Sequence, residues 1–242
     1  MQDISIPSMF NLLRQPLGFL ELTRLIKNYS ELIKLPKGNK EVVLVWPGFG
    51  TGDQFTSLLR LYLKKLNYQV HGWGLGFNHG NAHTLFPKVQ KQVEHWAHKS
   101  GQAISIIGWS LGGFMAREIA RDNPDKVKQV ITLGSPVVGG PKYSALSHIY
   151  RWMGHDLDDI EKNIDKRNEK LIQVPVTAIY SKSDGVLAWQ ICVDTLHKHV
   201  IHHEVKTSHL GLGFAPEVYQ IIAETLAKKR QSQKKKKSSN KN

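Results

Sequence analysis

The chain has 242 residues, of which 40% are hydrophobic and 22% are charged, and its formal net charge is +13. This composition is typical of one large folded domain and excludes a disordered or fibrous protein. The single cysteine, Cys192, excludes an intrachain disulfide and fits a reducing compartment. The longest uncharged stretch is interrupted by glycines and polar residues, so no membrane span is expected. No basic region precedes a long apolar run near the start of the chain, so we expect no signal peptide and a cytoplasmic protein.

The excess of positive charge is concentrated at the end of the chain. From Lys228 the sequence reads KKRQSQKKKKSSNKN, with eight lysines and arginines and no acidic residue. Because this segment has no apolar side chains to bury, residues 228–242 are predicted to form a disordered basic tail. The tail can serve as a solubilising end or make weak contact with an anionic membrane. Nucleic-acid binding is not favoured, and the tail does not define the function.

Short runs rich in valine and isoleucine alternate with longer helical patterns between residues 41 and 227. The runs predict strands, and the patterns between them predict helices. Their alternation indicates an α/β fold with a mostly parallel, doubly wound sheet. The predicted strands are 41–46, 68–73, 103–109, 128–133, 174–180 and 199–205, and the predicted helices are 53–66, 81–99, 111–121 and 215–227.

Two segments do not fit this alternation. Residues 1–40 have apolar positions at helical spacing and are predicted to pack on the core or to cover the site. Residues 141–170 are too long for a plain connection between strands and are a candidate lid. A crossover helix with additional residues at its start explains the second segment equally well.

The strongest local signal is the pattern Gly108-Trp109-Ser110-Leu111-Gly112, which fits G-x-S-x-G. A predicted strand precedes it and a predicted helix follows it, which is the context of a nucleophile elbow. Such a turn strains the serine backbone and leaves no room for side chains beside it. We therefore predict that Ser110 is a catalytic nucleophile, with a structural turn serine as the alternative.

A serine nucleophile needs a base, and the base needs an acid to orient it. His209 follows the last predicted strand, and Asp184 directly follows the fifth. Both therefore lie at carboxyl ends of strands, at the same sheet edge as Ser110. The other histidines near the last strand, and the aspartates of the charged stretch 156–159, are weaker candidates. The sequence thus predicts a triad of Ser110, Asp184 and His209.

The same edge is predicted to hold the oxyanion donors and a substrate pocket. Leu111 follows the nucleophile, and Phe49 lies in the glycine-rich loop after the first strand, so their N–H groups are the predicted donors. Neither phosphate-binding glycine motif is present. The aromatic residues Trp73, Phe77 and Trp109 are predicted to line an apolar pocket, although aromatic residues near strand ends also serve as ordinary packing residues.

Four motifs together resemble those of the α/β-hydrolase superfamily. They are GWSLGG at the nucleophile, VWPGFG in the oxyanion loop, SKSDGV at the acid and SHLG at the histidine. They are most similar to bacterial lipase- and esterase-like members, and the likeness covers residues 41–227. The chain departs from the family in one place: many members have His-Gly in the oxyanion loop, and this chain has Pro47-Gly48.

The residues and the resemblance together predict a serine hydrolase acting on a small-molecule ester or lipid. The reaction would proceed through an acyl-enzyme without a cofactor or metal. Two alternatives use the same fold. One is an acyltransferase or thioesterase with the same triad, and the other is a catalytically silent fold that binds an apolar ligand.

Overall fold

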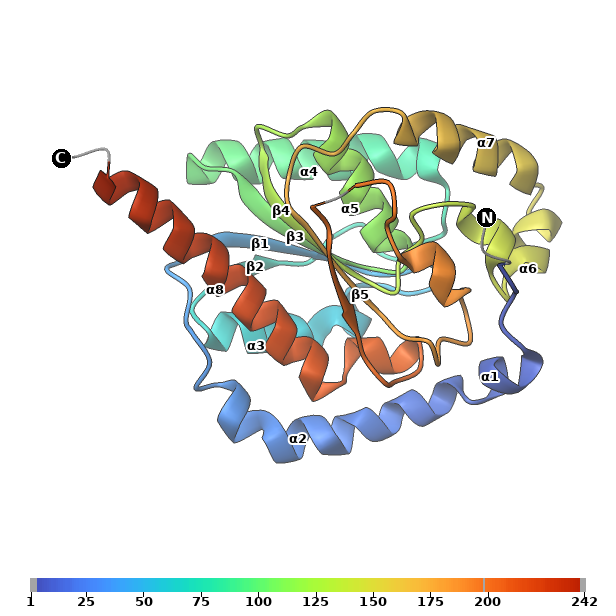
Figure 1. Cartoon of the computed structure of the whole chain (residues 1–242), viewed down its shortest axis with the longest axis horizontal. Helices are drawn as coiled ribbons and strands as arrows, with labels where there is room; N and C mark the ends of the chain where they lie inside the picture. Colours follow the sequence, from blue (N-terminus) through green and yellow to red (C-terminus); the bar gives the residue numbers. More distant parts are fainter. Residues whose placement is uncertain (1–3, 198, 240–242) are drawn as a thin grey trace.

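A single sheet of six strands runs through the centre of the molecule (Figure 1). The computed structural model describes residues 4–197 and 199–239. All neighbouring strands are parallel, in the order β2-β1-β3-β4-β5-β6. They are β1 (Val42–Trp46), β2 (Gln69–His71), β3 (Ile104–Trp109), β4 (Val127–Leu133), β5 (Val176–Tyr180) and β6 (Ile201–Glu204). Each overlaps one predicted run, which confirms the predicted fold class.

Helices cover both faces of the sheet, as a doubly wound fold requires. In Figure 1, α4 (Ala82–Ser100), α5 (Leu111–Asp122) and α7 (Leu157–Asn168) lie above it, and α2 (Glu21–Leu32), α3 (Ser57–Lys65) and α8 (Pro216–Ser239) lie below. Val43 and Val45 of β1 belong to the core shared with α3 and α8. Leu44 and Trp46 belong to the core shared with α4 and α5. Both faces of β1 are therefore buried, which explains its continuous apolar sequence.

The chain begins with a helical segment that runs along one edge of the molecule (Figure 1). It comprises α1 (Met9–Leu13), the 3₁₀ helix η1 (Gln15–Leu20) and α2. Leu25 enters the core, and Phe19 stacks on Phe214 with 5.8 Å between ring centroids. Arg24 forms an ion pair with Glu217 at the start of α8. These contacts fasten α2 against α8.

The segment predicted as a lid lies between β4 and β5. It contains the 3₁₀ helix η3 (Gly140–Tyr143), α6 (Ser147–Trp152) and α7. Lys142 of η3 forms ion pairs with Asp158 and Glu161 of α7 at 2.7 and 2.5 Å. Arg167 at the other end of α7 pairs with Glu118 of α5 at 2.6 Å. The segment thus combines a crossover helix, α7, with a short additional helix, α6.

The last helix is longer than the sequence predicted. α8 continues to Ser239, so residues 228–239 are helical rather than disordered. Lysine, arginine and glutamine have high helix propensity, and no glycine or proline interrupts this stretch. Within the described chain, no helix combines the length and the apolar character needed to cross a bilayer.

A buried ionic network joins α5 to the segment before β6. Arg117 Nη2 donates to Asp194 Oδ2 at 2.5 Å, and His197 Nδ1 contacts the same oxygen at 2.9 Å. The backbone N–H groups of Leu196 and His197 donate to Asp194 Oδ1. Burial disfavours the charge of this carboxylate, but the charge and hydrogen bond of Arg117 outweigh that effect. The pKa of Asp194 therefore lies below its ordinary value of 3.8.

We expect Asp194→Asn to lower the free energy of unfolding by about 3–5 kcal/mol at neutral pH, because Arg117 loses its buried counter-charge. Folding lowers the pKa of Asp194, so its charged form stabilises the fold above pH 3.8, and this contribution is lost as the pH falls further. Urea unfolding at neutral and acidic pH measures both effects. The difference in free energy of unfolding between the variant and the unchanged protein should become smaller in acid.

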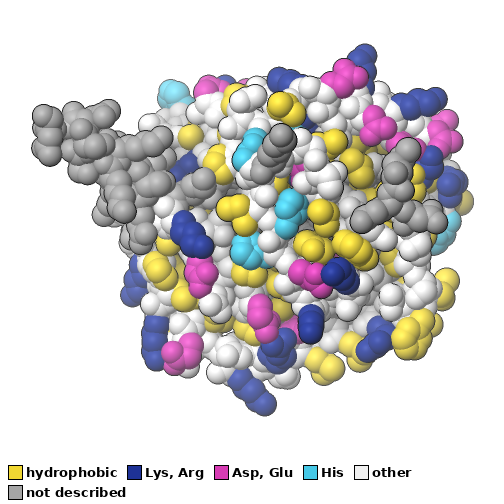
Figure 2. Space-filling model, viewed as in Figure 1, with side chains coloured by type: hydrophobic (Ala, Val, Ile, Leu, Met, Phe, Trp, Pro, Cys, Tyr) yellow, Lys and Arg dark blue, Asp and Glu magenta, His cyan; other side chains and the backbone are white. Residues whose placement is uncertain are grey.

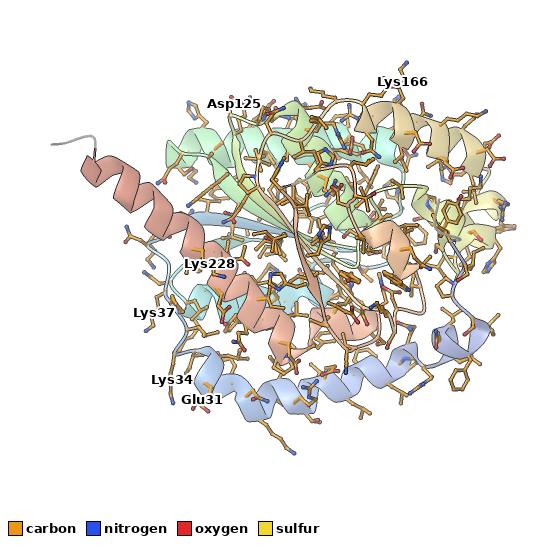
Figure 3. All side chains as sticks on the ribbon, in the orientation of Figure 1. Glu31, Lys34, Lys37, Asp125, Lys166 and Lys228 are labelled. Carbon is orange, nitrogen blue, oxygen red and sulfur yellow. The ribbon has the colours of Figure 1, made fainter. Side chains whose placement is uncertain are left out.

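Asp125→Asn is the matched control, because the Asp125 side chain is 73% exposed on the surface (Figure 3). It should change the free energy of unfolding by no more than about 0.5 kcal/mol. Equal deficits for the two variants would contradict this role for Asp194.

Candidate active site

Ser110 occupies a sharp turn between β3 and α5. Its backbone angles, φ 53° and ψ −120°, lie in a region that residues other than glycine rarely adopt. Its N–H donates to Leu133 O at 2.8 Å, and its carbonyl accepts the N–H of Gly113 at 3.0 Å. The hydroxyl does not cap the helix. Because Ser110 immediately precedes α5, its side chain stands at the N-terminus of that helix. There, backbone N–H groups and the helix dipole favour negative charge.

Close backbone packing explains the glycines on either side of this serine. A Cβ at Gly108 would lie 2.4 Å from Cα of Gly113. A Cβ at Gly112 would lie 2.6 Å from the carbonyl oxygens of Trp46 and Pro47. Real Cβ atoms do not approach other atoms this closely, so a larger residue at Gly108 would push α5 away from β3, and one at Gly112 would push α5 away from the end of β1.

Asp184 and His209 lie together at the ends of β5 and β6. His209 Nδ1 is 2.6 Å from Asp184 Oδ2, and both side chains are buried. Asp184 Oδ1 accepts the backbone N–H groups of Val186 and Leu187 at 2.7 and 2.8 Å. These bonds direct Oδ2 toward the imidazole. With Nδ1–H donating to the carboxylate, Nε2 of His209 is left with a lone pair.

The end of β4 brings Ser110 close to this pair. Leu133, which accepts the Ser110 N–H, is followed by Gly134. A Cβ at Gly134 would lie 3.0 Å from His209 Nδ1 and 3.2 Å from Asp184 Oδ2. Ser110 and the Asp184–His209 pair therefore both adjoin the end of β4. Ser110 Oγ and His209 Nε2 are not hydrogen-bonded in this structure, and such contacts commonly tighten when substrate binds.

Another buried histidine–aspartate pair has a different role. His197 contacts Asp194 within the network described above, and its Nε2 accepts the N–H of Ile172 at 3.2 Å. Both ring nitrogens are thus occupied by structural bonds. This pair cannot supply a general base, which leaves His209 as the better candidate.

Two backbone N–H groups beside Ser110 fit the predicted oxyanion donors. Leu111 is the first residue of α5, so its N–H has no acceptor inside the helix. The loop after β1 passes against the serine, since a Cβ at Gly48 would lie 3.1 Å from Ser110 Cβ and 3.8 Å from its Oγ. The N–H of Phe49, the next residue, makes no hydrogen bond to any described residue. Both N–H groups are available to a substrate oxygen.

Asn78, which the sequence analysis did not single out, holds this loop in place. Its side chain is buried, and its Nδ2 donates to Pro47 O at 3.0 Å. Its carbonyl accepts the N–H of Gly50 at 2.9 Å, and its N–H donates to Thr51 O at 2.8 Å. Three bonds from one residue therefore fix both ends of the loop. Because asparagine is common in ordinary turns, residue type alone does not reveal this role.

The aromatic residues predicted to line a pocket differ in their surroundings. Trp73 is 1% exposed, and its Nε1 donates to Gly76 O at 2.8 Å. It is therefore a core residue with no surface for a ligand, which corrects its predicted place in the pocket. Trp109 is also buried, and the centroids of its ring and the His209 ring are 6.2 Å apart. It therefore packs against the imidazole from the core side. Phe77 is 61% exposed on the loop before α4.

The N-terminal segment braces the loops that carry the acid and the histidine. The carbonyl of Gln15 accepts the hydroxyl of Ser208, and its Oε1 accepts the N–H of Leu210, both at 3.3 Å. A Cβ at Gly185 would lie 2.3 Å from the carbonyl oxygen of Asn11. One helical segment thus contacts both loops, a connection for which the sequence carries no signal.

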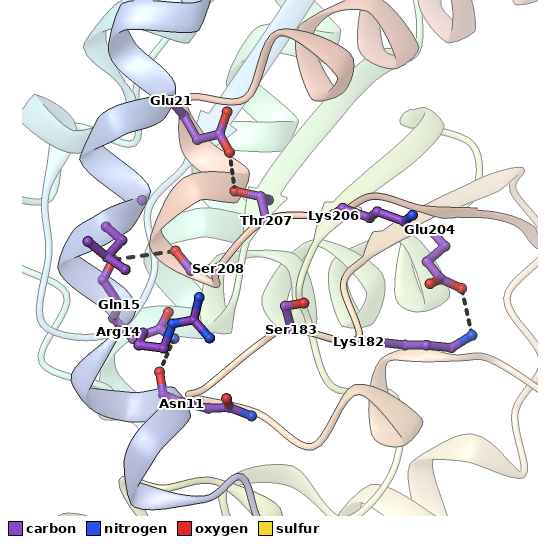
Figure 4. Close-up of a pocket in the computed structure, with 12 residues that line it drawn as sticks. Asn11, Arg14, Gln15, Glu21, Lys182, Ser183, Glu204, Lys206, Thr207 and Ser208 are labelled. Atoms are coloured by element: carbon purple, nitrogen blue, oxygen red, sulfur yellow. Dashed lines mark hydrogen bonds and ion pairs between the residues drawn. The ribbon is translucent and has the colours of Figure 1, made fainter.

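A cleft of about 540 Å³ opens between this segment and the same two loops. Figure 4 shows Glu21 hydrogen-bonded to Thr207 and Lys182 paired with Glu204 along its walls. Most residues that line it have polar or charged side chains, and Ser110 is not among them. The cleft therefore lies behind the two loops rather than over the serine.

Comparison with known proteins assigns the chain to a family. The model of the palmitoyl protein thioesterase family matches residues 42–186, more than half of the chain. The chain belongs to the palmitoyl protein thioesterase family. The match to this family runs from β1 through Ser110 and Asp184 and ends before His209. No curated protein matches the sequence significantly.

Solved structures identify the fold. A structure of the metagenome-derived lipolytic enzymes LipS and LipT is similar at a TM-score of 0.62, with 14% identity, covering 81% of this chain and 96% of that one. Est1E from Butyrivibrio proteoclasticus matches at 0.61, with 12% identity, covering 81% and 92%. The thioesterase domain from the curacin biosynthetic pathway matches at 0.56, with 15% identity, covering 79% and 93%. These likenesses show the α/β-hydrolase fold, as the sequence motifs predict.

We expect Asn78→Ala to lower the free energy of unfolding by about 1–3 kcal/mol, because it leaves the carbonyl of Pro47 without its donor. The Gly50 amide should also exchange with deuterium faster as the loop loosens. Urea unfolding and hydrogen exchange measure these effects. Asn163→Ala, at an exposed position of α7, is the matched control and should leave both nearly unchanged. The same result for both variants would show that the loop does not depend on Asn78.

Proposed function

We propose that the chain is a serine hydrolase that cleaves fatty acyl thioesters. The proposal rests on the 2.6 Å contact between Asp184 Oδ2 and His209 Nδ1, beside a serine at a strained turn. Membership of the palmitoyl protein thioesterase family supports a thioester with a long acyl chain. A carboxylic ester, favoured by the sequence analysis, is the second candidate because the same residues would cleave it.

In the first half of the proposed reaction, Ser110 Oγ attacks the carbonyl carbon while His209 Nε2 accepts the hydroxyl proton. Asp184 holds Nδ1–H and stabilises the imidazolium that forms. The developing oxyanion accepts hydrogen bonds from the N–H groups of Leu111 and Phe49. The carbon–sulfur bond then breaks, the thiol leaves with the proton from His209, and the acyl group stays on Ser110.

In the second half, His209 takes a proton from water, whose oxygen attacks the acyl-enzyme. The tetrahedral intermediate collapses, the proton returns to Ser110 Oγ, and the fatty acid is released. The overall reaction consumes one water and yields an acid and a thiol. Water and the side chains supply every proton that moves, so the proposed reaction requires no cofactor or metal.

The acyl chain is proposed to lie beside the contact that joins the oxyanion loop to α6. The ring of Phe49 contacts that of Tyr150 with 4.9 Å between centroids. Burial raises the pKa of the Tyr150 hydroxyl, so it stays protonated at neutral pH. Phe77 adds an exposed aromatic ring on the loop before α4. In this proposal residues 141–170 act as a lid over the bound acyl chain.

We expect Ser110→Ala to lower kcat for palmitoyl-coenzyme A hydrolysis by about 10⁶-fold, because no other group replaces the nucleophile. Thiol release measures the thioester reaction, and p-nitrophenyl esters from acetate to palmitate measure the ester reaction in parallel. Ser183→Ala, an exposed serine beside Asp184, is the matched control and should retain full activity.

The two substrate series distinguish the candidates. Faster hydrolysis of the long-chain thioester supports a thioesterase, and faster hydrolysis of esters supports the second candidate. Full activity in the Ser110 variant would contradict the proposed mechanism.

A further inference from the structure

Large apolar side chains are exposed along the outer face of the N-terminal segment. Of the seventeen exposed large apolar side chains in the described chain, nine lie between residues 6 and 29. Six of them, which we call the apolar ridge, are between 51% and 75% exposed: Met9, Phe10, Leu13, Leu17, Leu20 and Ile26. Figure 2 shows yellow side chains interspersed with dark blue ones along the lower edge, where this segment runs in Figure 1. Folded proteins rarely expose such a concentration unless the surface binds something.

The inner face of the same segment is already packed against the protein. Gln15, Gly18, Leu25 and Leu32 are buried there. The ridge therefore lies on the part of the segment that is turned away from the core, with Leu17 at the cleft described above, and no described element covers it. Burying it requires a surface beyond the described residues.

An apolar groove of about 430 Å³ continues the ridge between α2 and α3. Ile26 and Tyr29 line one side, and Leu58 and Leu61 line the other. Its lining includes no charged side chain. Such a groove suits a hydrocarbon chain better than a polar segment.

Basic residues accompany the ridge. Between residues 4 and 40 the chain has six lysines and arginines and two acidic residues, which pair with Arg24 and Lys34 and leave an excess of four positive charges. Figure 3 shows Lys34 and Lys37 near the end of α2, and Lys228 on the neighbouring α8. Lys228 begins the stretch of eight basic residues at the end of the chain. The charge around the ridge thus complements an anionic surface.

We infer that the apolar ridge docks onto the surface of a bilayer that contains anionic lipid. A helical segment with one apolar face and neighbouring basic residues is the pattern that lies in the membrane interface. We favour a lipid surface over a protein partner because basic residues flank the ridge and complement an anionic bilayer. Docking would place the loops that this segment braces near the lipid surface.

The inference does not rest on the proposed reaction, because docking is measured without substrate. Binding of the full chain is measured by flotation with vesicles of phosphatidylcholine, with and without the anionic lipid phosphatidylglycerol. The ridge variant combines Leu13→Ser with Leu20→Ser. The matched control combines Leu171→Ser with Leu196→Ser, two leucines that are 53% and 46% exposed outside the ridge. Thermal unfolding followed by circular dichroism checks that both variants fold.

We expect the protein to float with the anionic vesicles, and the ridge variant to bind them about tenfold or more weakly than the control. High salt should also weaken binding, because the basic residues contribute. Absence of binding to anionic vesicles, or equal binding by the two variants, would overturn the inference. Light scattering tests the remaining alternative, in which the ridge binds a second copy of the chain. If the unchanged protein is a dimer that does not bind vesicles, and the ridge variant is a monomer, the inference is overturned and the ridge is a dimer interface.

Discussion

The close approach of α5 to the ends of β3 and β1 is the constraint on which the candidate site depends. Only glycine fits at Gly108 and Gly112, because the carbonyl groups of the neighbouring backbone occupy the space of any Cβ. This packing forces Ser110 into a strained conformation with its side chain at the N-terminus of a helix. It also sets the loop after β1 against the serine, so one feature positions both the proposed nucleophile and the proposed oxyanion donors.

The remaining parts of the site come from strand ends that a parallel sheet places at one edge. Asp184 and His209 follow β5 and β6, and they reach each other because the backbone N–H groups at the acid loop fix the carboxylate. Asn78 holds the oxyanion loop, and Gln15 holds the histidine loop. The N-terminal segment therefore has two faces with different roles, since the inner one braces loops and the outer one is the apolar ridge.

Local patterns predicted the strands and the elbow, because buried parallel strands and strained turns restrict which residues can occur. The proximity of Asp184 and His209 also followed from their positions after strands. The roles of Trp73 and Asn78 depend on contacts with distant segments, so their residue types alone do not reveal them. The helical tail was missed because its charge and polarity suggested disorder, whereas its residues have high helix propensity.

The proposed reaction passes through an acyl group carried by Ser110. The most direct measurement is to mix the protein with palmitoyl-coenzyme A, quench with acid during turnover, and map the modified peptide by mass spectrometry. We expect a palmitoyl group on the peptide that contains Ser110, at that residue. Hydrolysis that proceeds with the acyl group on another residue, or with no acylated peptide in the quenched sample, would contradict it.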